Sequence, residues 1–337
     1  MYRKYCNIER LICNRKMGMK LLYFVIVIVI VLILSVTSCS PLHLPKENQW
    51  GEYLYQIDYN AADMRLKNDD GNLTLTLFYS PKLSSDAKIA KMKNGKMLNL
   101  IKKEYINPCL GYKNGKISLI TIHDPEEAGS FTEIWSRKIP GILSEKAVYD
   151  VNGNLVSIVA LQEKNDGKAA VLIIAPADGK ILNDSLIVDV PQELSGVFFA
   201  ISDDLKYLIF YNDIYENDYS KKKIYFFKLN QKVQCYELMN TMDAAKYSKE
   251  KYIDFVKISH DIAVISFERG TRGHLINKQI VIFYDLNKNK ILFEYKFDSV
   301  GGLRDVAISP ERRYVALQFF QYDSFIRLYK IKKNDGF

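Results

Sequence analysis

The strongest constraint on the fold comes from residues 304–331, a segment that recurs upstream in looser form. Its sequence, RDVAISPERRYVALQFFQYDSFIRLYKI, contains three runs rich in strand-forming residues, separated by Ser309–Arg312 and Gln321–Ser324. The first break contains a proline, which presets φ for a turn. The middle run, Tyr314–Phe319, is almost continuously apolar, which predicts a strand covered on both faces. A small sheet built around such a strand must lie between two other sheets.

Copies of this segment can be aligned by their Ile-Ser pairs. Ile201, Ile258 and Ile308 each precede a serine, at spacings of 57 and 50 residues, and a weaker copy covers residues 147–175. In each copy the pair is followed by an apolar run and then by a further strand-like run. The units also end alike, with a short run such as Lys290–Leu292 that would add an outer fourth strand. Four-stranded sheets repeated around an axis form a β-propeller.

The expected fold is therefore an all-β propeller of four-stranded antiparallel blades over residues 50–337. About 290 residues in units of about 50 predict six blades, with five and seven as alternatives. Turn pairs such as Asn94-Gly95 and Asp178-Gly179 are frequent, as hairpins require. No long helical pattern appears, and the best helical candidates, residues 86–92 and 242–249, are both short. Residues 53–59 are expected to supply the fourth strand of the last unit and so close the ring, because an open sheet edge is costly.

The N-terminal region has the pattern of a lipoprotein signal peptide. Fourteen apolar residues, Leu21–Leu34, follow a basic segment. This is the length of a signal-peptide core, whereas a membrane-spanning helix needs about 20 residues. The next residues, Val36-Thr37-Ser38-Cys39, resemble the bacterial lipobox, which implies cleavage between Ser38 and Cys39 and a lipid on the Cys39 sulfur. An uncleaved signal anchor is the alternative.

The predicted organisation is a signal peptide over residues 1–38, a lipidated tether over 39–49 and a propeller over 50–337. Several acyl chains on one residue give stable membrane anchoring. We therefore expect a protein of the cell envelope, anchored outside the cytoplasmic membrane and facing the periplasm or the cell surface. Without residues 1–38 the chain has 41 basic and 38 acidic residues. This near-neutral balance gives no indication of nucleic-acid binding.

One phrase of the repeat resembles a known family. Ile308–Ala316, ISPERRYVA, is similar to the ISPDGRYVA phrase of TolB-like propellers. The copies at 201–204 and 258–261 lack the proline and glycine of that phrase, and the similarity is diffuse over residues 50–140. The resemblance implies a six-bladed propeller of a kind found on lipoproteins of binding or unknown function.

The best candidate binding surface is formed by long loops on one face of the propeller. Connections at 212–223, 268–278 and 320–324 are longer than strand pairing requires, and long loops on a rigid scaffold often bind ligands. Tyrosine and arginine suit recognition because each combines contact area with a polar group. The alternative is that these loops are only solvated surface. The candidate residues are Asp213, Tyr215, Glu216, Asp218, Arg269, Arg272, His274, Tyr322 and Asp323.

These features predict a binding or scaffold module whose partner is an envelope protein or a glycan-type ligand. The rival interpretation is an envelope hydrolase or lyase that uses carboxylates around the channel, such as Asp150, Asp254 or Asp305. A purely structural envelope component is the third. No cofactor or metal is expected, since nucleophile, zinc and phosphate-loop motifs are absent and the acidic loop lacks EF-hand spacing.

The remaining histidines and cysteines are less informative. His123 and His260 are interpreted as turn residues, because both follow a strand-like run. Cys109 and Cys235 either form a disulfide or remain two free thiols, and their number does not decide between the two.

Overall fold

A computed structural model gives the fold. The chain divides into two compact units, residues 1–44 and 45–337, and all of the described residues belong to the second. The described ranges are 47–48, 51–58, 63–69, 72–78, 86–93, 96–104, 108–113, 115–122, 131–150, 155–191, 198–211, 223–247, 251–269, 277–299, 302–320 and 324–332.

Nearly all of these residues lie in antiparallel β-strands, and most strands pair with their neighbours in the chain. One four-stranded sheet contains β3 (Asp63–Asp69), β4 (Asn72–Phe78), β5 (Asp86–Lys93) and β6 (Lys96–Glu104). A three-stranded sheet contains β7 (Pro108–Lys113), β8 (Lys116–Ile122) and β9 (Phe131–Lys138). A further four-stranded sheet contains β18 (Lys251–Ser259), β19 (Ile262–Arg269), β20 (Asn277–Asp285) and β21 (Lys290–Ser299).

An eight-stranded sheet consists of two four-stranded halves. The first half contains β10 (Ile142–Tyr149), β11 (Leu155–Glu163), β12 (Lys168–Ile174) and β13 (Ile181–Asp189). The second contains β14 (Phe198–Ile201), β15 (Tyr207–Tyr211), β16 (Lys223–Asn230) and β17 (Cys235–Asp243). The strand pairing that joins the halves is parallel, between Ile187 and Val188 of β13 and Cys235 and Tyr236 of β17.

The last sheet combines both ends of the propeller unit. It contains β22 (Gly302–Ile308), β23 (Tyr314–Phe320) and β24 (Ser324–Ile331), followed by β2 (Gly51–Asp58) and the short β1 (Glu47–Asn48). Strand β2 runs antiparallel to β24, with Gly51 opposite Ile331 and Asp58 opposite Phe325. The predicted closure by residues 53–59 is confirmed, because β2 covers an edge that β24 would otherwise expose.

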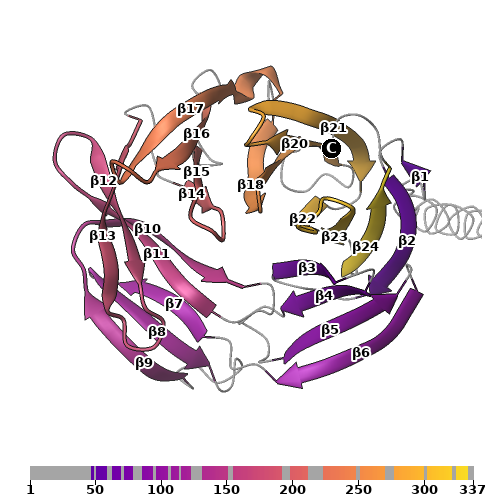
Figure 1. Ribbon diagram of the computed structural model, residues 1–337, viewed down its shortest axis with the longest axis horizontal. Coiled ribbons are helices and arrows are strands. Elements are labelled where there is room, and N and C mark those ends of the chain that lie inside the picture. Colours follow the sequence, from indigo (N-terminus) through magenta and orange to yellow (C-terminus); the bar gives the residue numbers. More distant parts are fainter. Residues whose placement is uncertain are drawn as a thin grey trace, which may run out of the picture. The chain divides into compact units, whose positions relative to one another are not determined.

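Within residues 45–337 the sheets follow one another around a common centre (Figure 1). Their faces pack against each other, as strand β15 shows. Leu208 and Phe210 belong to the core shared with β11 and β12, whereas Tyr207 and Ile209 belong to the core shared with β19 and β20. A middle strand covered on both faces is what the apolar runs predicted. This radial packing of antiparallel sheets is a β-propeller. The number of blades stays a prediction.

The repeat is visible in the hydrogen bonds of its turns. After β14, the backbone N–H of Leu205 donates to Ser202 O at 2.9 Å, and Tyr207 N–H donates to Ser202 Oγ at 2.9 Å. After β22, Arg312 N–H donates to Ser309 O at 2.8 Å, and Tyr314 N–H donates to Ser309 Oγ at 3.0 Å. The serine of the Ile-Ser pair therefore organises both turns, with and without the proline.

Three local predictions have different outcomes. His260 lies in the β18–β19 turn with a φ of 57°, so its assignment as a turn residue is confirmed. The helix predicted over 86–92 is wrong, because Asp86–Lys93 is strand β5 and pairs with both β4 and β6. The second helical candidate, 242–249, contains one 3₁₀ turn, Ala244–Lys246, after β17 ends.

Candidate functional site

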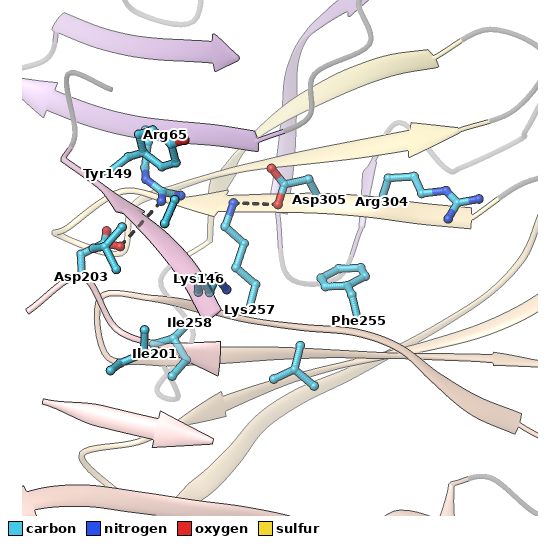
Figure 2. Close-up of a pocket in the computed structure, with 13 residues that line it drawn as sticks. Arg65, Lys146, Tyr149, Ile201, Asp203, Phe255, Lys257, Ile258, Arg304 and Asp305 are labelled. Atoms are coloured by element: carbon cyan, nitrogen blue, oxygen red, sulfur yellow. Dashed lines mark hydrogen bonds and ion pairs between the residues drawn. The ribbon is translucent and has the colours of Figure 1, made fainter. Parts of the chain in front are cut away.

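A pocket of about 330 Å³ opens where the first strands of several sheets converge. Strands β14 and β18, β18 and β22, and β22 and β3 are neighbours across sheet boundaries, so side chains from separate repeats reach the same space (Figure 2). The lining residues are Arg65, Lys146, Ala147, Val148, Tyr149, Ile201, Asp203, Phe255, Val256, Lys257, Ile258, Arg304 and Asp305.

A β-bulge shapes the wall formed by β22. The pairing with β23 shifts between Leu303 and Asp305, so Arg304 is the extra residue of the strand. Figure 2 shows the Arg304 guanidinium pointing away from the Asp305 carboxylate. Strand β18 has the same irregularity at Asp254, 50 residues earlier and therefore at the equivalent position of the repeat. Bulges redirect side chains and are common beside functional sites.

Asp305 and Lys257 form an ion pair across the boundary between two sheets. Lys257 Nζ lies 2.6 Å from Asp305 Oδ1, which also accepts the Val306 N–H at 2.8 Å. The lysine also donates to Met64 O of β3 at 3.2 Å. One ammonium group therefore joins β18, β22 and β3. Both side chains are largely buried, so the pair is shielded from the screening that weakens surface salt bridges.

A second ion pair joins more distant parts of the chain. Arg65 Nη2 of β3 lies 3.7 Å from Asp203 Oδ1, in the turn after β14 (Figure 2). At this length the contact is electrostatic and longer than a charge-assisted hydrogen bond, which measures about 2.7–2.9 Å. The Asp203 side chain is 32% exposed, against 13% for Arg65. The carboxylate of this pair is thus the more accessible to water.

Basic side chains outnumber acidic ones on the pocket wall. The described lining contains the basic residues Arg65, Lys146, Lys257 and Arg304 and the carboxylates Asp203 and Asp305. Tyr149 and Phe255 add aromatic surface, and the remaining residues are aliphatic. Among the described residues that line the pocket, none is a histidine, serine, threonine or cysteine. Such a wall is suited to holding a ligand by charge and apolar contact.

The carboxylates proposed for the enzyme alternative are only partly brought together. Asp305 lines the pocket, whereas Asp150 follows β10 just beyond the lining residue Tyr149. The side chain of Asp254 is outside the described residues. On the same inner strand as Lys146, burial raises the pKa of the Glu145 carboxyl, but Glu145 is not among the lining residues.

Most of the residues predicted from the loops cannot be placed. Asp213, Tyr215, Glu216, Asp218, Arg272, His274, Tyr322 and Asp323 lie outside the described residues, as do Ser38, Cys39 and His123. Arg269 is the last residue of β19, and its side chain is also outside them. The proposed recognition face therefore stays a prediction.

Cys235 is a free thiol at the start of β17, so it forms no disulfide with Cys109. Partial burial, with the nearby charges of Asp189 and Glu237, raises the pKa of this thiol, and a thiol with a raised pKa is poorly nucleophilic. Over the described part of the chain, no three side chains of the His, Cys, Asp or Glu type come together to hold a metal. No helix within those residues is long and apolar enough to cross a membrane.

The sequence interpretation missed the basic residues of the pocket. A signal was present, because Arg65 lies between the buried Met64 and Leu66, and Lys257 lies between the buried Val256 and Ile258. A basic residue between two buried apolar residues of a strand lies on the opposite face of the sheet from both of them, since successive side chains alternate between faces. The two triplets lie in different repeats, so only the fold shows that they share a pocket.

Comparisons with known proteins add little to this picture. No protein-family profile matches the chain. No curated protein is similar to it in sequence. A chain in the crystal structure of the mitotic checkpoint complex is 12% identical, with 80% of this chain and 76% of that chain covered and a TM-score of 0.33. A chain of Kuenenia stuttgartiensis hydrazine synthase is 13% identical, with 78% of this chain covered and a TM-score of 0.29; the present chain spans only 57% of its length. The fold assignment rests on sheet order and packing.

Proposed function

We propose that this protein is a lipid-anchored, extracytoplasmic six-bladed propeller that binds a ligand at the cell envelope. The observation that carries the binding function is the pocket at the convergence of β3, β10, β14, β18 and β22. Its wall is held in place by ion pairs between sheets, so the site is largely preformed. A preformed concave site with a few charged groups and apolar walls is typical of ligand binding.

Binding is favoured over hydrolysis by the surroundings of the two carboxylates. Asp305 faces Lys257 and Asp203 faces Arg65, so neither carboxylate faces the other. A neighbouring cation stabilises the charged form of a carboxylate, whereas a general acid must hold a proton near neutral pH. Two carboxylates that share a site, as a hydrolase of this kind would use, have the opposite arrangement.

The anchor is proposed from the sequence, with a lipid on Cys39 after cleavage at Ser38. A test is metabolic labelling with an alkyne fatty acid in the native host, comparing the wild type with Cys39→Ala. We expect label in the wild-type membrane fraction and none in the variant. Equal labelling of both chains would contradict the proposal.

The partner is proposed to be an envelope protein or a glycan-type ligand. Affinity capture from envelope extracts, with the full chain in detergent, would compare two sets of substitutions. One set replaces Tyr215, Arg272 and Tyr322 in the loops by alanine, and the other replaces Lys146 and Arg304 in the pocket by methionine. Loss of a partner only in the first set assigns recognition to the loop face, and loss only in the second assigns it to the pocket. If both variant proteins recover every partner that the wild type recovers, neither surface is the recognition surface.

A further inference from the structure

We propose that one edge of the propeller, formed by turns of three neighbouring sheets, lies against an anionic membrane surface. The inference rests on the proposed lipid on Cys39 and adds which surface of the folded unit faces the membrane. We call this surface the turn edge. It consists of the turns β14–β15, β16–β17, β18–β19, β20–β21 and β22–β23, which are residues 202–206, 231–234, 260–261, 286–289 and 309–313.

Hydrogen bonds between these turns hold them side by side. Arg312 Nε of the β22–β23 turn donates to Asp261 of the β18–β19 turn at 3.1 Å. Asn287 of the β20–β21 turn also donates to Asp261, and its Oδ1 accepts from Lys206 Nζ of the β14–β15 turn at 3.4 Å. The N–H of Leu229, just before the β16–β17 turn, donates to Lys206 O at 2.8 Å. The turn edge is therefore one continuous surface.

The N-terminal strands join the propeller at this same edge. The N–H of Ile331, the last residue of β24, donates to Arg313 O of the β22–β23 turn at 2.7 Å. Gly51, the first residue of β2, lies opposite Ile331. Glu47 of β1 in turn lies opposite Glu52 of β2. Figure 1 shows β2 beside β24, with β1 on its outer side. The chain that precedes β1 therefore leaves the folded unit close to the turn edge.

The length of that chain limits how far the turn edge can lie from the membrane. Eight residues, 39–46, precede Glu47. An extended chain spans at most about 3.3–3.6 Å per residue, so these residues reach about 29 Å at most. A lipid on Cys39 would fix the other end of the segment in the bilayer. The part of the turn edge beside β2 would then stay within about this distance of the membrane surface.

Two turns of this edge present a lysine beside an exposed aliphatic residue. In the β16–β17 turn, Val233 is 62% exposed and follows the exposed Lys232. At the end of the β20–β21 turn, Ile291 is 38% exposed and follows the exposed Lys290. A lysine at a membrane surface is attracted to anionic headgroups, while an aliphatic side chain enters the boundary between headgroups and acyl chains. Both lysine–aliphatic pairs therefore suit contact with an anionic bilayer.

The described turn edge also contains exposed acidic residues. Asp204 accepts a hydrogen bond from Ser202 Oγ at 2.6 Å, and Glu311 accepts one from Asn68 Nδ2 at 2.7 Å. The charge of the edge is therefore mixed. We expect attraction to the bilayer at the two lysine–aliphatic pairs and not over the whole surface.

The test measures how close two positions of β17 and its turn come to the bilayer. A fluorescent amino acid would replace either Val233 or Thr241, an exposed residue that lies about 20 Å along the strand from Cys235. The acylated full chain would be reconstituted into vesicles of phosphatidylcholine and phosphatidylglycerol with brominated acyl chains, which quench only nearby fluorophores. We expect quenching at Val233 to exceed that at Thr241 by about threefold or more, because only the turn edge meets the bilayer.

Matched variants test the part of the lysines. Lys232→Gln with Lys290→Gln should lower the quenching at Val233 by about twofold or more, because each basic residue near an anionic surface adds to the attraction. Added salt should weaken the wild-type quenching in the same way. Arg137→Gln with Lys138→Gln removes the same charge from exposed positions of β9 and should leave the quenching unchanged. Cooperative thermal unfolding of all variants would show that they are folded.

The outcomes separate this inference from the proposed anchor. Equal quenching at both positions, or stronger quenching at Thr241, in a chain whose mass shows the lipid on Cys39 would overturn the inference and leave the anchor intact. Quenching at Val233 that is the same with and without phosphatidylglycerol would overturn the contact with anionic headgroups. A full chain that has no lipid and does not float with vesicles would overturn both the anchor and the inference.

Discussion

Arg312 Nη1 lies 2.7 Å from Oδ2 of Asp285, a carboxylate with no exposed side-chain surface. The arginine belongs to the β22–β23 turn, and the aspartate ends β20 of the preceding sheet. The same guanidinium also contacts Asp261 in the β18–β19 turn, and Asp261 accepts from Asn287, which contacts Tyr207 of β15. Hydrogen bonds at one edge of the propeller thus connect three consecutive sheets.

Replacing Arg312 by methionine should strongly destabilise the fold. The substitution leaves Asp285 as a buried carboxylate without its main counter-charge, and breaking a buried pair costs about 3–5 kcal/mol. Urea unfolding of the full chain in detergent measures the change in the free energy of unfolding. Arg313→Met is the control, since the neighbouring Arg313 is exposed and should change the stability by less than about 0.5 kcal/mol. Similar losses in both variants would show that the Asp285 contact is unimportant.

Asp285 also makes stability depend on pH. Burial alone would raise the pKa of this carboxyl, but hydrogen bonds from Arg312 and the Lys288 backbone, with the arginine charge, outweigh it and hold the pKa below its usual value. A carboxylate whose pKa is depressed in the folded state stabilises the fold at pH values above its ordinary pKa of about 3.9. That stabilisation is lost as the pH falls through the folded-state pKa.

The measurement is urea unfolding between roughly pH 5 and pH 2, comparing the wild type with Asp285→Asn. The wild type should lose more stability over this range than the variant, which has no charge to lose at this position. Parallel curves for the two chains would mean that Asp285 does not contribute to acid sensitivity.

Gly179 cannot be replaced by alanine without a collision with Trp135. A Cβ atom at Gly179 would lie 2.5 Å from Cε3 of the indole, and the backbone φ is 68°, where a side chain is strained. Trp135 is itself fixed, because its Nε1 donates to Pro176 O at 2.6 Å. Gly179→Ala should therefore lower the free energy of unfolding by about 2–4 kcal/mol, from left-handed backbone strain plus overpacking.

Gly167 provides a matched control for that substitution. Its φ is 70°, but no atom lies within 4 Å of its Cβ position. Gly167→Ala has the backbone cost alone, about 1 kcal/mol. The difference between the two variants isolates the contact with Trp135, and tryptophan fluorescence should change only in Gly179→Ala. Equal losses would show that the indole moves away at no cost.

A structural feature could be predicted where its physical cause lies within one short segment of the sequence, and could not where the cause is a contact with another segment. The strand over 207–211 was predictable, because every residue of Tyr207–Phe210 is apolar and both faces of β15 are buried. The helical candidate over 86–92 was wrong because alanine, lysine and methionine favour helices, but this intrinsic preference is small and the pairing with β4 and β6 outweighs it. Propensity alone could not show that neighbouring strands were available.

The pocket could not be predicted from local pattern at all. Arg65 and Asp203 are far apart in sequence and in different sheets, and only ring closure brings them to 3.7 Å. Asp305 was considered because it is an acid on an inner strand. Lys257 was not considered, although its contact with Asp305 joins strands β18 and β22 of two different sheets. A search for catalytic acids overlooks cations that line a binding site.

Lys257→Met should destabilise the protein by about 3 kcal/mol, because it leaves Asp305 buried without the ammonium group. The double variant Lys257→Met, Asp305→Leu should recover much of that loss, since replacing a buried pair by apolar residues is often near neutral. Chemical unfolding of the wild type, both single variants and the double variant gives the coupling energy. Additive losses would show that the two residues do not interact.

Deleting residues 50–60 should uncover the edge of β24 and weaken the whole ring. Seven residues of β2 pair with β24, and Ile57 is buried in the core shared with β3 and β4. Loss of several kcal/mol in a domain of this size corresponds to a fall in melting temperature of about 10 °C or more. A synthetic peptide of residues 50–60 should restore the melting temperature in a concentration-dependent way, because a strand that binds only the folded chain stabilises it by mass action. The same peptide with Ile57→Asp would place a charge in the core and should not restore it. An unchanged melting curve after the deletion would refute the view that β2 closes the propeller.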